Sequence, residues 1–276
     1  RALDRALVST AGEGGGQRTR SSLATLTRWM PTRDHRAAVV AAKEILLTLR
    51  DPMRRTNWIG AWAVGIVSPL GFMLTQGLAL GKGEALLAAF PALTAAGGIN
   101  LNGFGLDGTA IWTQISSAAS LRADLRGRVL GMLAMNLPCA VLAAGIFAVA
   151  GGHPGSAPLG ICAGAGTLLA VLGAGAFLSV RVPMVRARSA FGVSPGVSGR
   201  SILSSATAVL LSLLGLAPGG VLVGAGLHGW SPGLYLGAPV LIAGGGAVCA
   251  AGVRIASRWV EHRQPELLQA VSPRRA

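Results

Sequence analysis

The side chains able to do chemistry gather in one stretch of an otherwise apolar chain, residues 100–128. They belong to Asp107, Gln114, Arg122, Asp124, Arg126 and Arg128. Residues 129–180, which follow, contain no Asp, Glu, Lys or Arg. An ionisable side chain at the centre of a bilayer costs about 2.5–3.5 kcal/mol on insertion scales. The contrast therefore indicates a water-exposed loop followed by membrane-embedded segments, and we expect the loop to be cytoplasmic.

Two short motifs suggest catalysis or nucleotide binding, and both are incomplete. The run 196–199 matches the GxSG motif of rhomboid-type intramembrane proteases, but a serine nucleophile needs an adjacent base, and every histidine lies in a predicted loop or tail. Gly81-Lys82 resembles the end of a phosphate-binding loop, but that pattern requires Gly at Gln76 and Ser or Thr at Gly83. We therefore expect that this chain is not itself an enzyme.

The cysteines and histidines do not form a metal-binding pattern. Cys139, Cys162 and Cys249 all lie inside apolar runs without CxxC spacing, and the four histidines lack the spacing of metal ligands. The thiols are therefore predicted to be small packing residues, and we expect no metal site on this chain.

Composition indicates a membrane protein. Hydrophobic residues make up 51% of the chain and charged residues 12%, whereas soluble domains contain about 25% charged residues. The net charge of +14 is also seen in nucleic-acid binders, which carry a basic stripe. Here nearly all Lys and Arg lie between apolar runs or at the two ends. We therefore expect contact with the lipid bilayer and none with nucleic acid.

Four runs without Asp, Glu, Lys or Arg predict the spans, at 56–81, 85–106, 129–180 and 201–253. One crossing takes about 20 residues, so the first two runs hold one helix each and the longer two must fold back. Gly- and Pro-rich turns at 151–156 and 228–233 divide them. The predicted fold class is an all-α polytopic integral membrane protein, with six transmembrane helices at 57–80, 85–104, 129–150, 157–180, 202–227 and 234–253.

Basic residues lie almost entirely on one of the two sides of the predicted bundle. One side receives Arg50, Arg54, Arg55, Arg122, Arg126, Arg128, Arg181, Arg186, Arg188, Arg200, Arg254, Arg258 and Arg263, and the other receives Lys82 alone. Because cytoplasmic loops carry the excess of Lys and Arg, both termini are predicted to be cytoplasmic. The connections at Lys82, His153 and His228 are then predicted to face outward.

The segment before the first span is predicted to form a linker and a helix. Residues 1–36 have the Arg-, Ser-, Thr- and Gly-rich composition of a flexible basic linker. Residues 37–50 favour a helix, which Asp51-Pro52 ends because a residue before proline leaves the helical region. Its leucines share a face with Lys43 and Arg50, whose cations can snorkel from an interfacial position. A helix on the cytoplasmic membrane surface is expected, with a small soluble bundle as the alternative.

These segments predict the domain organisation. A linker at 1–36 leads into an interfacial connecting helix at 37–52, a six-helix transmembrane domain at 53–263 and a cytoplasmic tail at 264–276. Within the spans, Gln76, Asn100 and Asn136 are candidates to line a substrate path, and interhelical hydrogen bonding is the alternative for each. No acidic or basic residue is predicted deep in a span, which disfavours an ion-coupled carrier.

The interfacial helix with Lys43-Glu44 and Leu49-Arg50-Asp51-Pro52, the six spans, and the loop FGLDGTAIW at 104–112 together resemble the permease of an ABC exporter of the type-2 export class. They are most similar to two-halved actinobacterial permeases, which fuse two six-span units. The chain begins at Arg1 without an initiator Met, so we expect the later, C-terminal half of a longer polypeptide.

The resemblance implies a division of labour. Residues 37–50 would match the connecting helix, with Lys43, Glu44, Arg50 and Asp51 on it or at its end. The coupling segment at 108–120, within the cytoplasmic loop 105–128, would dock on a separate ATP-binding cassette subunit that holds ATP and Mg. The residues expected to couple to that subunit are Asp107, Trp112, Gln114, Arg122 and Arg126.

The resemblance also implies the remaining partners and the location. A second six-span unit, either a fused half or a second copy, would complete the path in a bacterial plasma membrane. The charge-poor spans suit a hydrophobic or amphipathic substrate. The alternatives are an ion-coupled secondary transporter and a membrane-embedded enzyme. A neighbouring reading frame that encodes a P-loop ATPase would favour the exporter over both.

Overall fold

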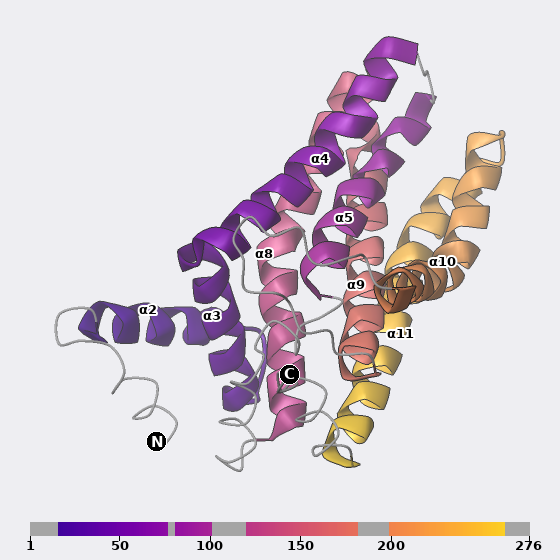
Figure 1. Cartoon of the computed structure of the whole chain (residues 1–276). Coiled ribbons are helices and arrows are strands. Elements are labelled where there is room, and N and C mark those ends of the chain that lie inside the picture. Colours follow the sequence, from indigo (N-terminus) through magenta and orange to yellow (C-terminus); the bar gives the residue numbers. More distant parts are fainter. Residues whose placement is uncertain (1–15, 77–80, 101–119, 182–198, 263–276) are drawn as a thin grey trace.

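The structure, a computed structural model, describes residues 16–76, 81–100, 120–181 and 199–262. All regular secondary structure in these ranges is helical (Figure 1). The elements in chain order are α2 (Gly16–Trp29), α3 (His35–Arg50), α4 (Pro52–Gln76), η1 (Gly81–Ala88), α5 (Ala89–Asn100), α8 (Leu121–Ala150), η3 (Pro154–Ser156), α9 (Ala157–Arg181), α10 (Gly199–Leu227) and α11 (Pro232–His262).

Five helices within the described ranges are long and apolar enough to cross a membrane, at Pro52–Thr75, Leu121–Ala150, Pro154–Arg181, Ala206–Leu227 and Pro232–His262. The protein is therefore a helical membrane protein with several long apolar helices. The predicted second span differs from the others, because its described part is the 3-10 helix η1 followed by the short helix α5. The count of six crossings stays a prediction.

Close packing against α9 accompanies the 3-10 geometry of η1. In a 3-10 helix, residues three apart stack directly above one another, as Ala85 and Ala88 do. Both are fully buried. The Ala85 carbonyl lies against Gly160 of α9, and the Ala88 carbonyl lies against Gly164, where no larger side chain would fit without a shift. The Gly160/Gly164 pair therefore serves the close helix approach that its four-residue spacing predicts.

The two predicted turns are confirmed. Helix α8 ends at Ala150 and η3 leads into α9, while α10 ends at Leu227 and α11 begins at Pro232. Gly152 has φ +73° and Gly229 has φ +109°, values that only a residue without Cβ adopts readily. The long apolar runs therefore fold back at the points where Gly and Pro concentrate.

Helix α9 lies at the centre of the bundle. It packs against α5, α8, α10 and α11, and Leu168, Val171 and Leu172 are almost fully buried. Its contact with α11 brings two backbones together, because Gly166 lies against Gly245 and, seven residues further along each helix, Gly173 lies against Gly252. Small residues at such spacing allow helices in a membrane to approach closely.

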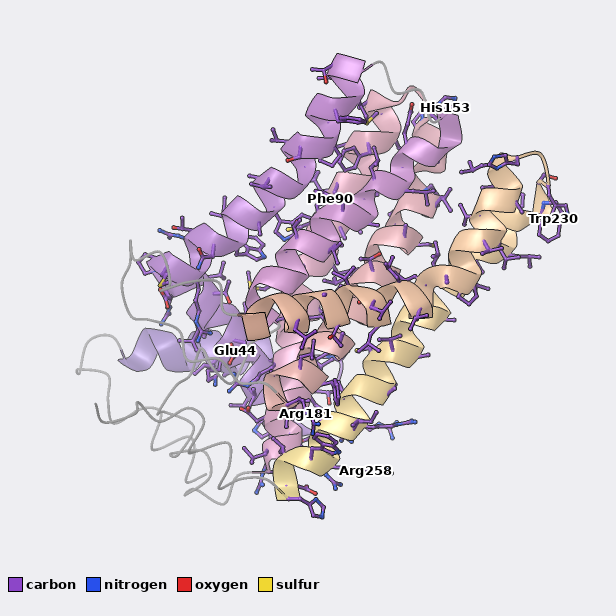
Figure 2. The ribbon with its side chains drawn as sticks, turned by 45° about the vertical axis from the view of Figure 1, so that its right-hand side comes forward. Glu44, Phe90, His153, Arg181, Trp230 and Arg258 are labelled. Atoms are coloured by element: carbon purple, nitrogen blue, oxygen red, sulfur yellow. The ribbon has the colours of Figure 1, made fainter. Side chains whose placement is uncertain are left out.

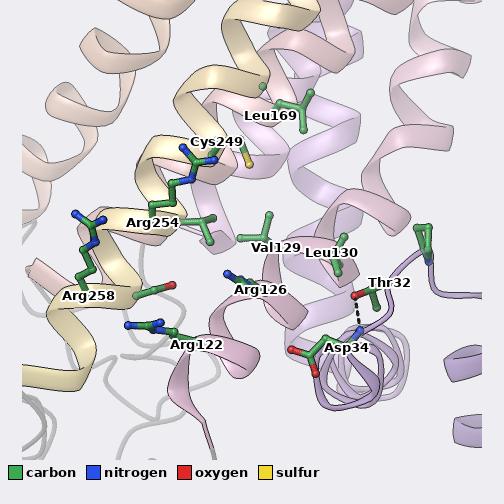
Figure 3. A pocket seen from close by; sticks show the side chains of 15 residues that line it. Thr32, Asp34, Arg122, Arg126, Val129, Leu130, Leu169, Cys249, Arg254 and Arg258 are labelled. Carbon is green, nitrogen blue, oxygen red and sulfur yellow. Dashed lines mark hydrogen bonds between the residues drawn. The ribbon is translucent and has the colours of Figure 1, made fainter.

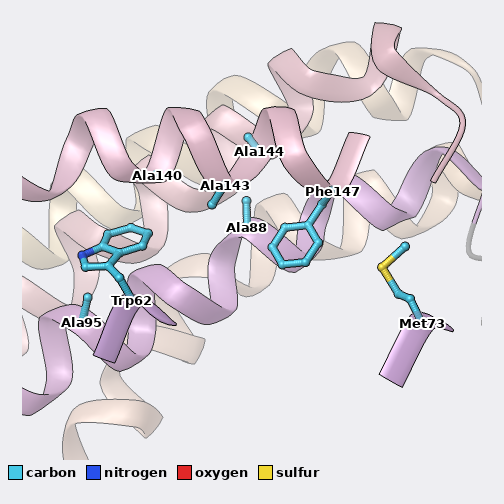
Figure 4. Packing of buried hydrophobic residues seen from close by; sticks show 8 residues of the cluster. All are labelled: Trp62, Met73, Ala88, Ala95, Ala140, Ala143, Ala144 and Phe147. Carbon is cyan, nitrogen blue, oxygen red and sulfur yellow. The ribbon is translucent and has the colours of Figure 1, made fainter. Parts of the chain in front are cut away.

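A second cluster of buried hydrophobic residues lies between α4, α5 and α8 (Figure 4). Phe147 is fully buried, and Trp62 and Met73 of α4 are less than one-tenth exposed. Between them lie Ala88, Ala95, Ala140, Ala143 and Ala144, which keep the helices close. The large side chains therefore fill the gaps that the alanines leave open.

The outward faces of α4 and α10 are apolar, as expected of helices that face lipid. Leu74 is 78% exposed and Val221 is 71% exposed. Helix α10 also bends along its length (Figure 2), and it contains Pro218. Proline removes one backbone hydrogen bond and causes most sharp helix kinks.

The N-terminal segment differs from the predicted linker, because α2 occupies Gly16–Trp29 and packs against α3. Leu23, Leu26 and Met30 are each partly buried, and their spacing of three to four residues places them on one face of a helix. Burial of this face against α3 therefore stabilises a helix in a segment whose polar composition predicted a flexible linker.

The predicted helix end at Asp51 is confirmed. The backbone N–H of Asp51 closes α3 on the Leu47 carbonyl at 2.9 Å. Its Oδ1 then accepts hydrogen bonds from the backbone N–H groups of Met53 and Arg54, the first at 2.9 Å. Asp51 therefore ends α3 and caps the start of α4, so the chain turns between them without a loop.

Candidate functional site

The candidate site lies at the end of the bundle where the start of α8 packs against α3 and against the end of α11, which we call the basic end. The predicted coupling residues Asp107, Trp112 and Gln114 lie outside the described residues, as does Ser198, the serine of the GxSG run. Arg122 and Arg126 are exposed on the first turns of α8. Ser120 caps this helix by accepting a hydrogen bond from the Ala123 N–H at 3.4 Å. Helix α8 therefore begins well before the predicted span start at residue 129.

A buried acid organises the basic end. Glu44 of α3 has a side chain only 3% exposed, and its carboxylate lies 3.1 Å from the Arg54 guanidinium of α4 and 3.8 Å from that of Arg128 of α8. Lys43 adds an ammonium group at 3.2 Å. Arg128 also pairs with Asp124 at 2.7 Å. This group, Lys43, Glu44, Arg54, Asp124 and Arg128, is called the ionic cluster below.

The ionic cluster is placed by close packing of α3 on α8. A Cβ at Gly127 would lie 2.5 Å from the Cβ of Val40, and one at Gly131 would lie 2.8 Å from the Ala41 carbonyl oxygen. Ala37 and Ala41 of α3 are almost fully buried at this contact. The small residues bring the two backbones close enough for Glu44 to reach Arg128.

This packing shows a face of α3 that the sequence did not predict. The helix buries its alanine face and Glu44 within the protein, whereas Leu47 and Leu49 on the other side are exposed. Arg50 is exposed at the end of the helix. The exposed leucines suit the predicted contact with the membrane surface, which stays a prediction.

The start of α8 is also tied to the end of α11. A guanidinium nitrogen of Arg122 lies 2.6 Å from the Glu261 carboxylate. Beside this pair, the guanidinium of Arg181 stacks over the Trp259 ring at 4.6 Å from its centroid, and Phe177 meets the same ring edge-on. Charged and aromatic contacts therefore join α8, α9 and α11 at one end of the bundle.

A groove of about 680 Å³ opens between α8 and α11 at this end (Figure 3). Arg122, Arg126, Arg254 and Arg258 line its mouth, together with Asp34, while Leu130 and Leu169 are among the residues that line its depth. The sequence placed all four arginines on one side of the membrane. It contained no signal that those of α8 and α11 would share a groove.

Of the three candidate path-lining residues, two stand at the ends of described helices and one has a defined set of hydrogen bonds. Gln76 and Asn100 are the last described residues of α4 and α5. Asn136 is 1% exposed. Its Oδ1 accepts hydrogen bonds from the indole N–H groups of Trp58 at 3.0 Å and Trp62 at 2.9 Å, and its Nδ2 donates to the Met132 carbonyl. For Asn136 this geometry favours the alternative, interhelical hydrogen bonding between α4 and α8.

Sequence reasoning missed a second buried acid at the opposite end of the bundle. Glu84 of η1 is only 4% exposed, and its Oε2 lies 3.8 Å from Nδ1 of His153, an exposed residue in the turn before α9. Gly151 lies directly against the carboxylate, where a side chain would clash. In the sequence, Glu84 stands between two of the predicted charge-free runs, next to the connection at Lys82 that is predicted to face outward. The signal that could have found it is the long apolar run that begins one residue later.

The described residues contain no group of three or more His, Cys, Asp and Glu side chains that could hold a metal ion. Cys139, Cys162 and Cys249 are separate, partly buried free thiols. The functional groups at the basic end are mainly guanidinium and carboxylate groups, which suit the binding of a charged partner or ligand.

Comparisons with protein-family models, with curated proteins and with solved structures found no match to this chain.

Proposed function

We propose that this chain is the transmembrane permease subunit of an ATP-driven exporter of the type-2 ABC class. A separate ATP-binding cassette subunit, which holds ATP and Mg, drives it through the cytoplasmic loop 105–128. The observation that carries the proposal is the attachment of the described end of this loop, the first turns of α8, to α3, α4 and α11 through the ionic cluster and the Arg122–Glu261 pair.

The length of α8 supports contact with a partner outside the membrane. It has 30 residues and is therefore about 45 Å long at 1.5 Å per residue. The hydrocarbon core is only about 30 Å thick. The excess belongs at the basic end, because Arg122, Asp124, Arg126 and Arg128 all lie in the first turns. A partner bound there would contact the first turns of α8, which continue directly into the part of the helix long enough to span the membrane.

The ionic cluster is suited to transmit a movement of the first turns of α8 to α3 and α4. Glu44 joins α3 to α4 and α8 through charges that are mostly buried. Separating buried ion pairs is costly, so these helices are expected to move together when α8 is displaced. A second six-span unit, fused or separate, would form the other wall of a path for a hydrophobic or amphipathic substrate.

The proposal includes the predicted topology. η1 and α5 would contribute to the remaining crossing, which completes six spans with both termini in the cytoplasm of a bacterial cell. The exposed apolar faces of α4 and α10 are compatible with lipid or a second six-span unit.

One observation favours a second candidate, an ion-coupled secondary transporter. Buried acids in membrane proteins often carry protons or ions, and Glu84 is such an acid facing His153. The pair lies at the turn end of α8 and α9 rather than midway along the bundle. An exporter driven from the basic end gives a role to the whole ionic cluster, whereas the ion-coupled transporter gives a role only to the Glu84–His153 pair.

The test is purification of the full-length protein from its native membrane in mild detergent, with partners identified by mass spectrometry. We expect a P-loop ATPase at near-equal stoichiometry. Arg122→Glu should lower the ATPase recovered by about tenfold, the change that roughly 1.4 kcal/mol of lost docking energy produces.

Glu261→Gln is the matched control, because it removes the Arg122–Glu261 pair without altering the charge of the loop. It should leave ATPase recovery unchanged. Recovery of the membrane protein alone, with no ATPase stimulation in lipid, would overturn the proposal and favour the carrier.

A further inference from the structure

The groove between α8 and α11 changes character along its length. On α11 the residues Arg258, Arg254, Ala250 and Gly246 all line it, and their four-residue spacing places them on one face over about 18 Å of helix. On α8 the same spacing runs from Arg122 and Arg126 to Leu130. Both helices therefore present guanidinium groups at the mouth and apolar or small residues further in.

The charge at the mouth is not balanced within the groove. Four arginines and one aspartate line it. Arg122 pairs with Glu261, but Arg126, Arg254 and Arg258 make no ion pair within the part of the chain that the structure describes. Asp34 is occupied as the cap of α3, where its carboxylate accepts hydrogen bonds from two backbone N–H groups at 3.0 and 3.4 Å. The mouth therefore has the charge and the free donors to hold an anion.

A buried hydroxyl adds a further polar group to the lining. Ser257 is 5% exposed and lines the groove, and its Oγ has no hydrogen-bond partner among the described residues. A buried hydroxyl without a partner is costly. The hydroxyl oxygen is closed to solvent, so the exposed guanidinium groups are the donors for an oxygen-rich group such as a phosphate.

The deeper lining is apolar. It includes Val129, Leu130, Leu169 and Val253, drawn from α8, α9 and α11 (Figure 3). A free phosphate would occupy only the mouth and leave this lining without a partner. A molecule that joins a phosphate to a hydrocarbon chain would satisfy both parts of the groove.

We infer that this groove binds an anionic phospholipid, with the phosphate among Arg126, Arg254 and Arg258 and an acyl chain against the apolar lining. Planar guanidinium groups match phosphate geometry, and basic pockets between transmembrane helices recognise acidic lipid headgroups. The site does not depend on the proposed exporter function, because its chemistry involves the bilayer alone.

The test is native mass spectrometry of the full-length protein titrated in mild detergent with phosphatidylglycerol or phosphatidylcholine. Phosphatidylglycerol should bind more tightly. Each basic side chain near an anionic surface contributes about fivefold to binding, so Arg254→Gln with Arg258→Gln should weaken phosphatidylglycerol binding by about twenty-five-fold. Both positions lie outside the loop that would contact an ATPase, so loss of lipid is read independently of partner recovery.

Two further variants separate this site from general effects of charge or folding. Arg36→Gln with Arg55→Gln removes the same charge from two exposed residues of α3 and α4 outside the groove, and should leave lipid binding within about twofold of the wild type. Ala250→Phe fills the groove without changing charge, and should weaken phosphatidylglycerol binding even though every arginine remains.

Three results would overturn the inference. The first is equal binding of the two lipids by the wild type. The second is equal loss of lipid in the groove and control double variants. The third is competition by glycerol phosphate at the concentration at which the whole lipid binds, which would assign the mouth to a soluble phosphate and leave the apolar lining without a role.

Discussion

At the scale of single residues, Glu44 shows how burial changes the role of a charge. In the sequence it follows Lys43 on a helix expected to lie at the membrane surface. In the structure its carboxylate is almost inaccessible and faces the guanidinium groups of Arg54 and Arg128. The cost of burying an acid is therefore offset by cations from two other helices.

This burial predicts a large cost for removing the acid. Glu44→Ala should lower the free energy of unfolding by about 3–5 kcal/mol, because it leaves mostly buried guanidinium groups beside a cavity. Glu261→Ala is the control: it removes an exposed acid from a pair of similar length and should cost less than about 1 kcal/mol. Thermal unfolding in detergent would compare them, and equal losses would show that the ionic cluster does not hold α3 in place.

At the scale of elements, the crossing of α9 and α11 depends on glycines. A Cβ at Gly245 or Gly252 would meet the backbone of Gly166 or Gly173 directly. Helices packed this closely gain van der Waals contact that lipid cannot supply. The contact also positions the face of α11 that carries Arg254 and Arg258.

Adding one methyl group should therefore have different effects on stability at two neighbouring glycines of α11, Gly245 and Gly246. Gly245→Ala is expected to destabilise the protein by about 1–3 kcal/mol through overpacking against α9. At Gly246 a Cβ meets nothing within 4 Å, so Gly246→Ala should be neutral or stabilising, because Ala favours a helix more than Gly does. Thermal unfolding of both variants measures the contrast. Similar shifts would argue against a close crossing.

At the scale of the whole molecule, the distribution of charge predicts the orientation. The ionic cluster, the Arg122–Glu261 pair and the groove mouth all lie at the basic end, whereas the turns at His153 and His228 lie at the opposite end (Figures 1 and 2). Because Lys and Arg are retained on the cytoplasmic side, the basic end is expected to face the cytoplasm.

Labelling of single cysteines in intact cells tests this orientation. In a background without Cys139, Cys162 and Cys249, a membrane-impermeant maleimide should label His153→Cys and His228→Cys, both in exposed turn residues. Arg36→Cys and His262→Cys, exposed at the basic end, should react only after the membrane is opened. The reverse pattern would place the basic end outside.

The sequence by itself determined the features that depend on local composition. The apolar runs predicted helices that can cross a membrane, the Gly- and Pro-rich segments predicted the turns after Ala150 and Leu227, and Asp51-Pro52 predicted the end of α3. Each follows from the length, hydrophobicity or backbone freedom of a short segment. The 3-10 geometry of η1 and the helix α2 escaped prediction because both depend on what packs against them.

Only the tertiary structure decided which faces of the helices meet. It brought Glu44 to Arg128, joined Asn136 to two indoles, buried Glu84 beside the turn before α9, and placed the arginines of α8 and α11 around one groove. These contacts join residues far apart in the chain. Their partners are selected by close approach of small residues and by the pairing of buried charge, neither of which a local pattern specifies.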